Sequence, residues 1–203
     1  MNIIEFYFDL GSPYSYIGFH QIQKLAAQYQ AEIIWKPMLL GGVFKATGNS
    51  SPITVPAKGQ YSRLVLKRWS KFLDIPFNMN PDFPINTLQL MRVVTGLQLF
   101  QNEKFLMVVT ALFKALYHEH QPIQNAAVLI QLLSQFDISA EQIEHWLADE
   151  KVKAELKLVT EEAIAKGVFG APTCFVGGEM FWGVDHFNFV ETVLGEQSHG
   201  HGK

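Results

Sequence analysis

The feature that most constrains the fold is an apolar strand that leads directly into a helix start near the N-terminus. Ile3–Phe8 is apolar apart from Glu5 and rich in β-branched and aromatic residues, as expected for a buried strand. Ser12 then suits a helix N-cap, with Pro13 at the first helical position, where a missing N–H costs nothing. A second strand is predicted over residues 31–38. The segment therefore indicates a βαβ unit with parallel strands and a right-handed crossover.

The rest of the chain is predicted to be a block of helices followed by a strand hairpin. Residues 39–57 form a Gly/Ser/Pro-rich stretch, which we interpret as a long loop. From about residue 58 to 166 every periodic stretch indicates a helix, including one that opens with a capping box at Ser139 and one that ends at Gly167. Residues 173–176 and 179–182, separated by two glycines, predict a hairpin, and residues 185–194 a closing helix.

Neither end of the chain can complete a sheet alone, so the helical block is predicted to interrupt one α/β domain. We predict a thioredoxin-like domain made of residues 1–57 and 167–203, with a large all-helical insertion, residues 58–166. Pro172 precedes a strand and follows a small residue, where thioredoxin-like proteins place a cis-proline beside the active site. Only this context favours cis, because cis bonds are about 5% of X–Pro bonds in folded proteins.

Composition excludes several classes of protein. Hydrophobic residues make up 48% of the 203 residues, enough for a substantial core. The net charge of −3 has no dominant sign, which argues weakly against non-specific nucleic-acid binding, since that needs clustered Lys and Arg. The N-terminus does not resemble a secretory signal, and no apolar run approaches the roughly 18 residues of a membrane span. We therefore expect a cytoplasmic protein that binds neither nucleic acid nor membranes.

The single cysteine, Cys174, allows no intramolecular disulfide and no cysteine-based metal cluster, and its apolar strand predicts a buried, unreactive thiol. His118 and His120 end a predicted helix, where a structural role is expected. His199 and His201 lie in a polar tail that we expect to be solvated. No metal site is predicted.

Four motifs, in the same order along essentially the whole chain, resemble the kappa-class glutathione transferases and the 2-hydroxychromene-2-carboxylate isomerases. The motifs are "FYFDLGSPYSY", "GNSSPITVPAKGQY", "KGVFGAPT" and "GGEMFWGVDHF". These two groups share one fold and resemble DsbA in having a helical domain inserted into a thioredoxin domain. One departure is Gly11, where the family usually has a larger apolar residue.

The resemblance implies a glutathione site. Ser12, beside Pro13, would stabilise the glutathione thiolate, and Asn49 and Lys58 would reach the glycyl end. The backbone of Ala171, before Pro172, would pair with the cysteinyl part, while Val184 and Asp185 would hold the γ-glutamyl group. Without the resemblance, Ser12 and Asp185 are simply helix caps, Asn49 a turn residue and Lys58 a solvated charge. Ser15 could face the site or the helix exterior.

The chemistry of a helix start supports the implied role of Ser12. A helix N-terminus presents free N–H groups and partial positive charge, which stabilise an anion. Redox thioredoxins use this to stabilise their own cysteine thiolate in a C-P-x-C motif, whereas this chain has Ser12 and Ser15 there. A serine hydroxyl ionises poorly but donates a hydrogen bond, so it could stabilise a thiolate supplied by glutathione.

The resemblance implies a glutathione-dependent isomerase that acts on an aromatic unsaturated keto acid by reversible thiolate addition, bond rotation and elimination. The segment "GEMFWG" is more similar to the isomerases than to the transferases. A kappa-like transferase or peroxidase, or a non-redox binding protein, stays open. We expect a homodimer, and a mostly buried aromatic set that partly lines an aryl pocket: Trp69, Phe72, Phe77 and Phe83.

Overall fold

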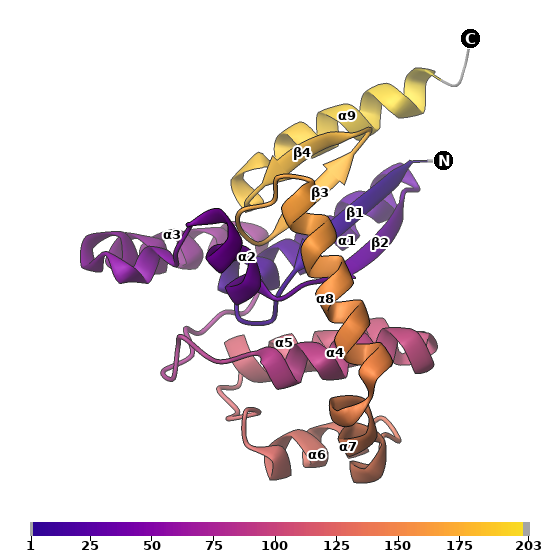
Figure 1. Ribbon diagram of the computed structural model, residues 1–203. Coiled ribbons are helices and arrows are strands. Elements are labelled where there is room, and N and C mark those ends of the chain that lie inside the picture. The colour runs from indigo at the N-terminus through magenta and orange to yellow at the C-terminus, as the bar shows by residue number, and fades with distance from the viewer. Residues whose placement is uncertain (1, 201–203) are drawn as a thin grey trace.

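The computed structural model describes residues 2–200, and the side chains of residues 2–197. Its sheet has the order β2-β1-β3-β4 (Figure 1). β1 (Ile3–Phe8) pairs in parallel with β2 (Glu32–Pro37), whereas β3 (Thr173–Val176) is antiparallel to both β1 and β4 (Glu179–Trp182). The predicted βαβ unit and glycine hairpin are therefore confirmed. The two tail histidines, His199 and His201, fall outside the described side chains.

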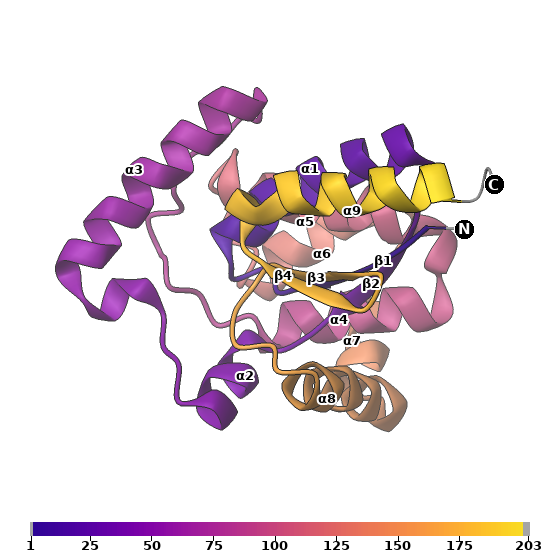
Figure 2. The ribbon, with the colours of Figure 1, turned by 90° about the horizontal axis from the view of Figure 1, so that it is seen from above.

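Successive side chains of β1 point to opposite faces of the sheet. They are buried on both faces, because helices cover both. Phe6 and Phe8 point into the main core, which α1 (Pro13–Tyr29) and α9 (Phe187–Gly200) help to form. Tyr7 points the other way, into a smaller core that includes residues of α2 (Leu40–Thr47) and α8 (Glu150–Ala165). These two helices lie side by side (Figure 2). All three aromatic side chains are fully buried.

The predicted helical block is confirmed as a run of helices between the two halves of the sheet. They are α3 (Pro56–Leu73), α4 (Leu88–Phe100), α5 (Phe105–Tyr117), α6 (Ala126–Ser134), α7 (Ala140–Ala148) and α8 (Glu150–Ala165). The capping box of α7 is present, and Gly167 has φ +84° after α8. The main core runs without a break from the sheet into α4–α7, and the division into two domains stays a prediction. No described helix has the length and apolar character needed to cross a membrane.

The prediction of a long loop over residues 39–57 was wrong. This stretch contains α2 (Leu40–Thr47) and the short 3-10 turn η1 (Pro52–Thr54), and α3 begins at Pro56, not at residue 58. The Leu39 N–H bonds to Thr160 Oγ1 at 2.9 Å, and a Cβ on Gly42 would lie 3.2 Å from the same threonine. Packing against α8 therefore outweighs the low helix propensity of the two glycines in α2.

The aromatic set is also less buried than predicted. Trp69 and Phe77 pack against the core but remain partly exposed, as does Phe83, and Phe72 is 79% exposed. Phe72 belongs to α3, a helix that stands away from the sheet (Figure 2). The helical period alone did not reveal that this helix has solvent on one side.

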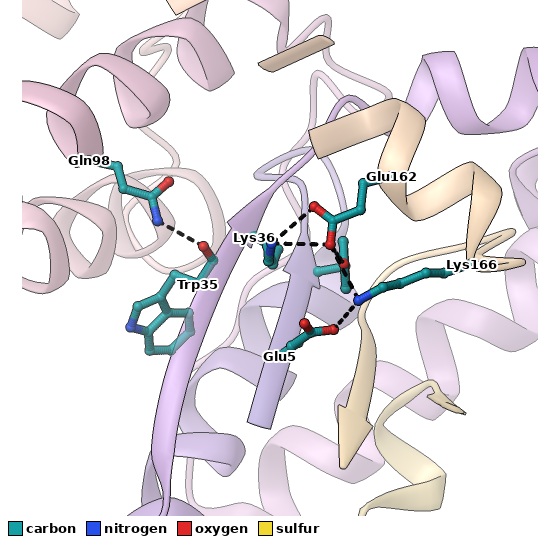
Figure 3. A network of polar contacts seen from close by, with 7 residues as sticks. Glu5, Trp35, Lys36, Gln98, Glu162 and Lys166 are labelled. Carbon is teal, nitrogen blue, oxygen red and sulfur yellow. Dashed lines mark hydrogen bonds and ion pairs between the residues drawn. The ribbon is translucent and has the colours of Figure 1, made fainter. Parts of the chain in front are cut away.

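A charged network fixes the C-terminal end of α8 to the sheet (Figure 3). Lys36 Nζ lies 3.0 Å from Glu162 Oε2, and the Tyr7 hydroxyl donates to Glu162 Oε1 at 2.7 Å. Lys166 pairs with Glu5 of β1. Because the chain continues from Lys166 directly into the segment before β3, this network helps to position that segment beside the start of α1.

Candidate active site

The Ser12 side chain joins the start of α1 to the segment before β3. Its Oγ accepts a hydrogen bond from the Ser15 N–H at 3.1 Å and donates to the Ala171 carbonyl oxygen at 2.9 Å. Ser12 is the N-cap of α1 and Pro13 is its first residue, as predicted. The Ser12 side chain is 5% exposed, so its hydroxyl lies in a largely dehydrated environment at a helix N-terminus.

A buried carboxylate, Asp9, organises the turn that carries Ser12. Asp9 Oδ1 accepts hydrogen bonds from the Gly11 N–H at 2.8 Å and the Thr87 hydroxyl at 2.7 Å, and Oδ2 accepts one from the Leu40 N–H at 2.8 Å. Asp9 therefore ties together the Ser12 turn, α2 and the start of α4. Burial raises the pKa of Asp9, and the three hydrogen bonds partly oppose that effect.

The backbone of the same turn has further partners in the helical block. The Leu10 N–H lies 3.3 Å from Met91 Sδ, and the Leu10 carbonyl accepts a hydrogen bond from the Tyr117 hydroxyl at 2.9 Å. A Cβ on Gly11 would lie 3.1 Å from Thr87 Cγ2. The departure from the family pattern at Gly11 therefore coincides with a close approach of α4, and the turn is held by contacts on several sides.

The segment before β3 packs tightly on α1. The Ala171–Pro172 bond is cis, which agrees with the context of the motif. A Cβ on Gly18 would lie 2.9 Å from Pro172 Cγ and 3.4 Å from Val184 Cγ1, so only glycine allows this approach without a shift. The structure thus brings Ser12, Ala171, Pro172 and Val184 to one end of α1.

Asn49 and Lys58 both follow β2 in the chain, Asn49 between α2 and η1 and Lys58 in α3. Asn49 Nδ2 donates to the Phe169 carbonyl at 2.7 Å, which places Asn49 next to the segment that carries Ala171. Lys58 lies in the first turn of α3 and is exposed. No contact ties the Lys58 side chain to the other predicted site residues within the described structure.

Asp185 faces the start of α1 from the 3-10 turn η3 (Val184–His186). It is exposed, whereas the neighbouring Val184 is buried. The Tyr14 hydroxyl bonds to the Ser62 hydroxyl of α3 and lies near Asp185. Burial raises the pKa of Tyr14, the Ser62 hydrogen bond partly opposes this effect, and the Asp185 charge adds to it. Tyr14 thus lies between α3 and Asp185, beside Ser12.

Sequence reasoning did not identify four residues that shape this site: Asp9, Tyr14, Gly18 and Thr87. Asp9 and Tyr14 lie within the motif "FYFDLGSPYSY" and Gly18 lies two residues after it, but nothing in the sequence distinguishes Asp9 from an ordinary turn acid. Nothing in the sequence indicated a role for Thr87, because it contacts Asp9 only in the folded chain. Ser15, left open, is fully buried, and its Oγ has no hydrogen-bond partner among the described residues.

The prediction that the Cys174 side chain is buried is confirmed. Cys174 is fully buried in β3, and burial raises the pKa of its thiol to about 12, so a thiolate is strongly disfavoured. His118 caps the C-terminal end of α5. Among the described residues, no three His, Cys, Asp or Glu side chains are grouped closely enough to hold a metal ion.

The residues present suit a thiolate that arrives with a peptide-like ligand. The α1 N-terminus and the Ser12 hydroxyl favour an anionic sulfur, while the Ala171 carbonyl can accept an amide N–H in the manner of an added strand. An exposed carboxylate at Asp185 and an exposed ammonium at Lys58 suit an ammonium and a carboxylate, respectively. Glutathione carries all of these groups.

Comparison with known proteins places the chain among relatives of matching length. Residues 3–195 match the family model of the DSBA-like thioredoxin domain. Glutathione S-transferase kappa 1 of Caenorhabditis elegans is 32% identical, over 94% of this chain and 90% of the relative. The 2-hydroxychromene-2-carboxylate isomerase of Pseudomonas sp. (strain C18) is 31% identical, over 95% of this chain and 90% of the relative.

Solved structures agree with this placement. A 2-hydroxychromene-2-carboxylate isomerase superposes with a TM-score of 0.84 at 25% identity, covering 98% of this chain and 97% of the other. A probable DsbA oxidoreductase from Streptomyces coelicolor has a TM-score of 0.74 at 15% identity, which supports the fold alone. The DsbA-like fold and the predicted relationship to both groups are therefore confirmed.

Proposed function

Because this chain belongs to the DsbA-like thioredoxin family, together with the kappa-class glutathione transferases and the 2-hydroxychromene-2-carboxylate isomerases, we propose that it is a glutathione-dependent isomerase. The observation that carries this proposal is the Ser12 hydroxyl, which caps α1 and lies 2.9 Å from the Ala171 carbonyl oxygen. A redox thioredoxin would need a thiol here, and the chain's one cysteine is buried elsewhere.

The Ser12 hydroxyl has one proton, so it can donate to only one acceptor at a time. In the structure that acceptor is the Ala171 carbonyl. We propose that the amide N–H of the cysteinyl part of glutathione takes over the Ala171 carbonyl. The Ser12 hydroxyl is then free to donate to the sulfur, while its Oγ keeps the cap on Ser15. Ligand binding would thereby exchange one hydrogen bond for two.

The other predicted residues would hold the two ends of glutathione. Asp185 would pair with the γ-glutamyl ammonium beside Val184, and Lys58 would pair with the glycyl carboxylate. Asn49 already bonds to the Phe169 carbonyl, so it would support the segment that carries Ala171 and Pro172 as well as the ligand.

Bound glutathione would supply a thiolate nucleophile that adds reversibly to an activated double bond and is regenerated on elimination, after rotation about the former double bond. The protein would contribute the low thiol pKa through Ser12 and the α1 N-terminus. The substrate we propose is an aromatic unsaturated keto acid of the 2-hydroxychromene-2-carboxylate type, named for the isomerase relatives.

The stoichiometry of glutathione tests this function. We expect 2-hydroxychromene-2-carboxylate to be converted completely with glutathione at about one hundredth of its concentration, with free thiol intact at the end. A halt after about one equivalent would instead indicate a transferase, the activity named in the kappa-class relatives. No conversion and no glutathione binding would leave a non-redox binding protein.

A further inference from the structure

Ser15, the third residue of α1, has a buried hydroxyl without a hydrogen-bond partner. In the described part of the chain three side-chain oxygens are buried in this way, and the other two belong to Gln21 and Gln101, which are partly exposed. Ser15 is 0% exposed. A buried hydroxyl that makes no hydrogen bond destabilises a protein, so its presence beside the candidate site calls for a physical reason.

The position of Ser15 in α1 explains why the usual partner is missing. A buried serine or threonine inside a helix commonly donates to the carbonyl four residues earlier, as Thr95 of α4 does to Met91 at 2.8 Å. Four residues before Ser15 is Gly11, which precedes the helix, and Ser15 makes no bond of this kind to any described residue. The proton of the Ser15 hydroxyl therefore remains available for another acceptor.

The Ser12 side chain offers that acceptor. Ser12 Oγ accepts a hydrogen bond from the Ser15 N–H at 3.1 Å, and this bond occupies one of the two lone pairs of a hydroxyl oxygen. Ser12 and Ser15 take the two cysteine positions of a C-P-x-C motif, whose side chains approach closely enough to form a disulfide. Rotation of the Ser15 side chain to another staggered rotamer can therefore bring its hydroxyl to the second lone pair of Ser12 Oγ.

A bound thiolate gives this second hydrogen bond a function. In the structure the Ser12 hydroxyl donates to the neutral Ala171 carbonyl at 2.9 Å. An anionic sulfur is a stronger acceptor, and a hydroxyl that donates to an anion becomes a better acceptor itself, because hydrogen bonds in a chain polarise one another. Ser12 and Ser15 are 5% and 0% exposed, so water competes little for either hydroxyl.

We propose that Ser15 is a positioning residue for the glutathione sulfur: when the thiolate binds, the Ser15 hydroxyl donates to Ser12 Oγ while the Ser12 hydroxyl donates to the sulfur. This inference rests on the proposed function. No proton is transferred, and the hydrogen bond that Ser12 gives up is the one to the Ala171 carbonyl, which the ligand replaces. Ser15 acts only through Ser12 and only with ligand bound, which distinguishes its hydroxyl from a structural one.

The experiment compares wild type with Ser15→Ala, Ser12→Ala and the double variant Ser12→Ala/Ser15→Ala. Thr95→Val is the matched control, because Thr95 carries a fully buried helical hydroxyl that has a partner. The absorbance of the bound thiolate, followed across a pH titration with saturating glutathione, gives the thiol pKa in each protein. Titration calorimetry gives the glutathione affinity, and thermal unfolding without glutathione gives Tm.

Ser15→Ala should raise the thiol pKa of bound glutathione by about half a unit to one unit, the contribution of one neutral hydrogen bond. It should leave Tm without glutathione unchanged or higher, because alanine removes an unsatisfied hydroxyl and favours a helix. In the Ser12→Ala background the same substitution should not change the thiol pKa, because Ser15 acts through Ser12. Thr95→Val should show the opposite pattern, with a lower Tm and the thiol pKa of wild type.

An unchanged thiol pKa in Ser15→Ala would overturn the inference and leave the proposed function intact. A lower Tm of Ser15→Ala without glutathione would also overturn it, since the hydroxyl would then be bonded before the ligand arrives. An equal pKa shift in the Ser12→Ala background would do the same, since Ser15 would then act on the sulfur without Ser12. If wild type bound no glutathione, or bound it with the thiol pKa of free glutathione, the proposed function would fall together with this inference.

Discussion

Replacing Ser12 by alanine removes two hydrogen bonds whose costs can be separated. The cap bond from the Ser15 N–H contributes about 1 kcal/mol, and the bond to the Ala171 carbonyl about 1 kcal/mol more. The free energy of unfolding should therefore fall by about 2 kcal/mol. For a chain of this length that lowers Tm by about 4–8 °C, which differential scanning calorimetry measures.

The catalytic effect of Ser12→Ala should exceed its effect on stability. Losing a hydrogen bond to a charged sulfur costs about 1.5–3 kcal/mol, which lowers kcat about ten- to a hundred-fold. Ser139→Ala is the matched control, because Ser139 caps α7 with the same geometry in the capping box. It should lower Tm by about 2–4 °C and leave kcat unchanged. Equal kcat values for wild type and Ser12→Ala would refute the role given to this hydroxyl.

Three further predictions follow from buried groups. Because burial raises the pKa of Asp9, its protonation favours the fold; this stabilisation is complete below the unfolded pKa, about 4, and is lost as pH rises through the folded pKa. The free energy of unfolding of wild type should therefore increase relative to that of Asp9→Asn between pH 7 and pH 4, as measured by urea unfolding at each pH. A difference between the two proteins that does not change with pH would contradict this. Gly18→Ala should weaken glutathione binding severalfold in calorimetry, because its Cβ would lie 2.9 Å from Pro172 Cγ; unchanged affinity would show that Pro172 yields freely. Cys174→Ala should keep glutathione-dependent turnover, since the thiol is buried with a pKa raised to about 12; lost turnover in a folded variant would make Cys174 a nucleophile.

Much of the fold could be predicted because local signals agreed with one another. The cap at Ser12, the proline after it and the apolar strand before it each favour the same strand-to-helix turn, and the structure has that turn. The stretch over residues 39–57 was misjudged because its glycines indicate a loop locally. What makes Leu40–Thr47 helical is packing on α8, which lies more than a hundred residues later in the chain.

The sequence predicted a site residue only where the residue type and its neighbours in sequence already indicated its role. Ser12 and Pro172 could be named from their neighbours in sequence, whereas Asp9 could not be distinguished from a turn acid. Its significance depends on the Leu40 N–H and on Thr87, which reach it only in the folded chain. The exposure of Phe72 was likewise invisible, because the apolar pattern of a helix does not say what covers it.

The central claim is that the protein stabilises a thiolate supplied by bound glutathione. The thiol pKa of bound glutathione tests this claim most directly. Thiolate absorbance near 240 nm is followed across a pH titration of wild type with saturating glutathione, and again with Ser12→Ala. The account predicts a bound thiol pKa well below that of free glutathione, and a value raised towards the free one in Ser12→Ala. A bound pKa equal to that of free glutathione in wild type would contradict it.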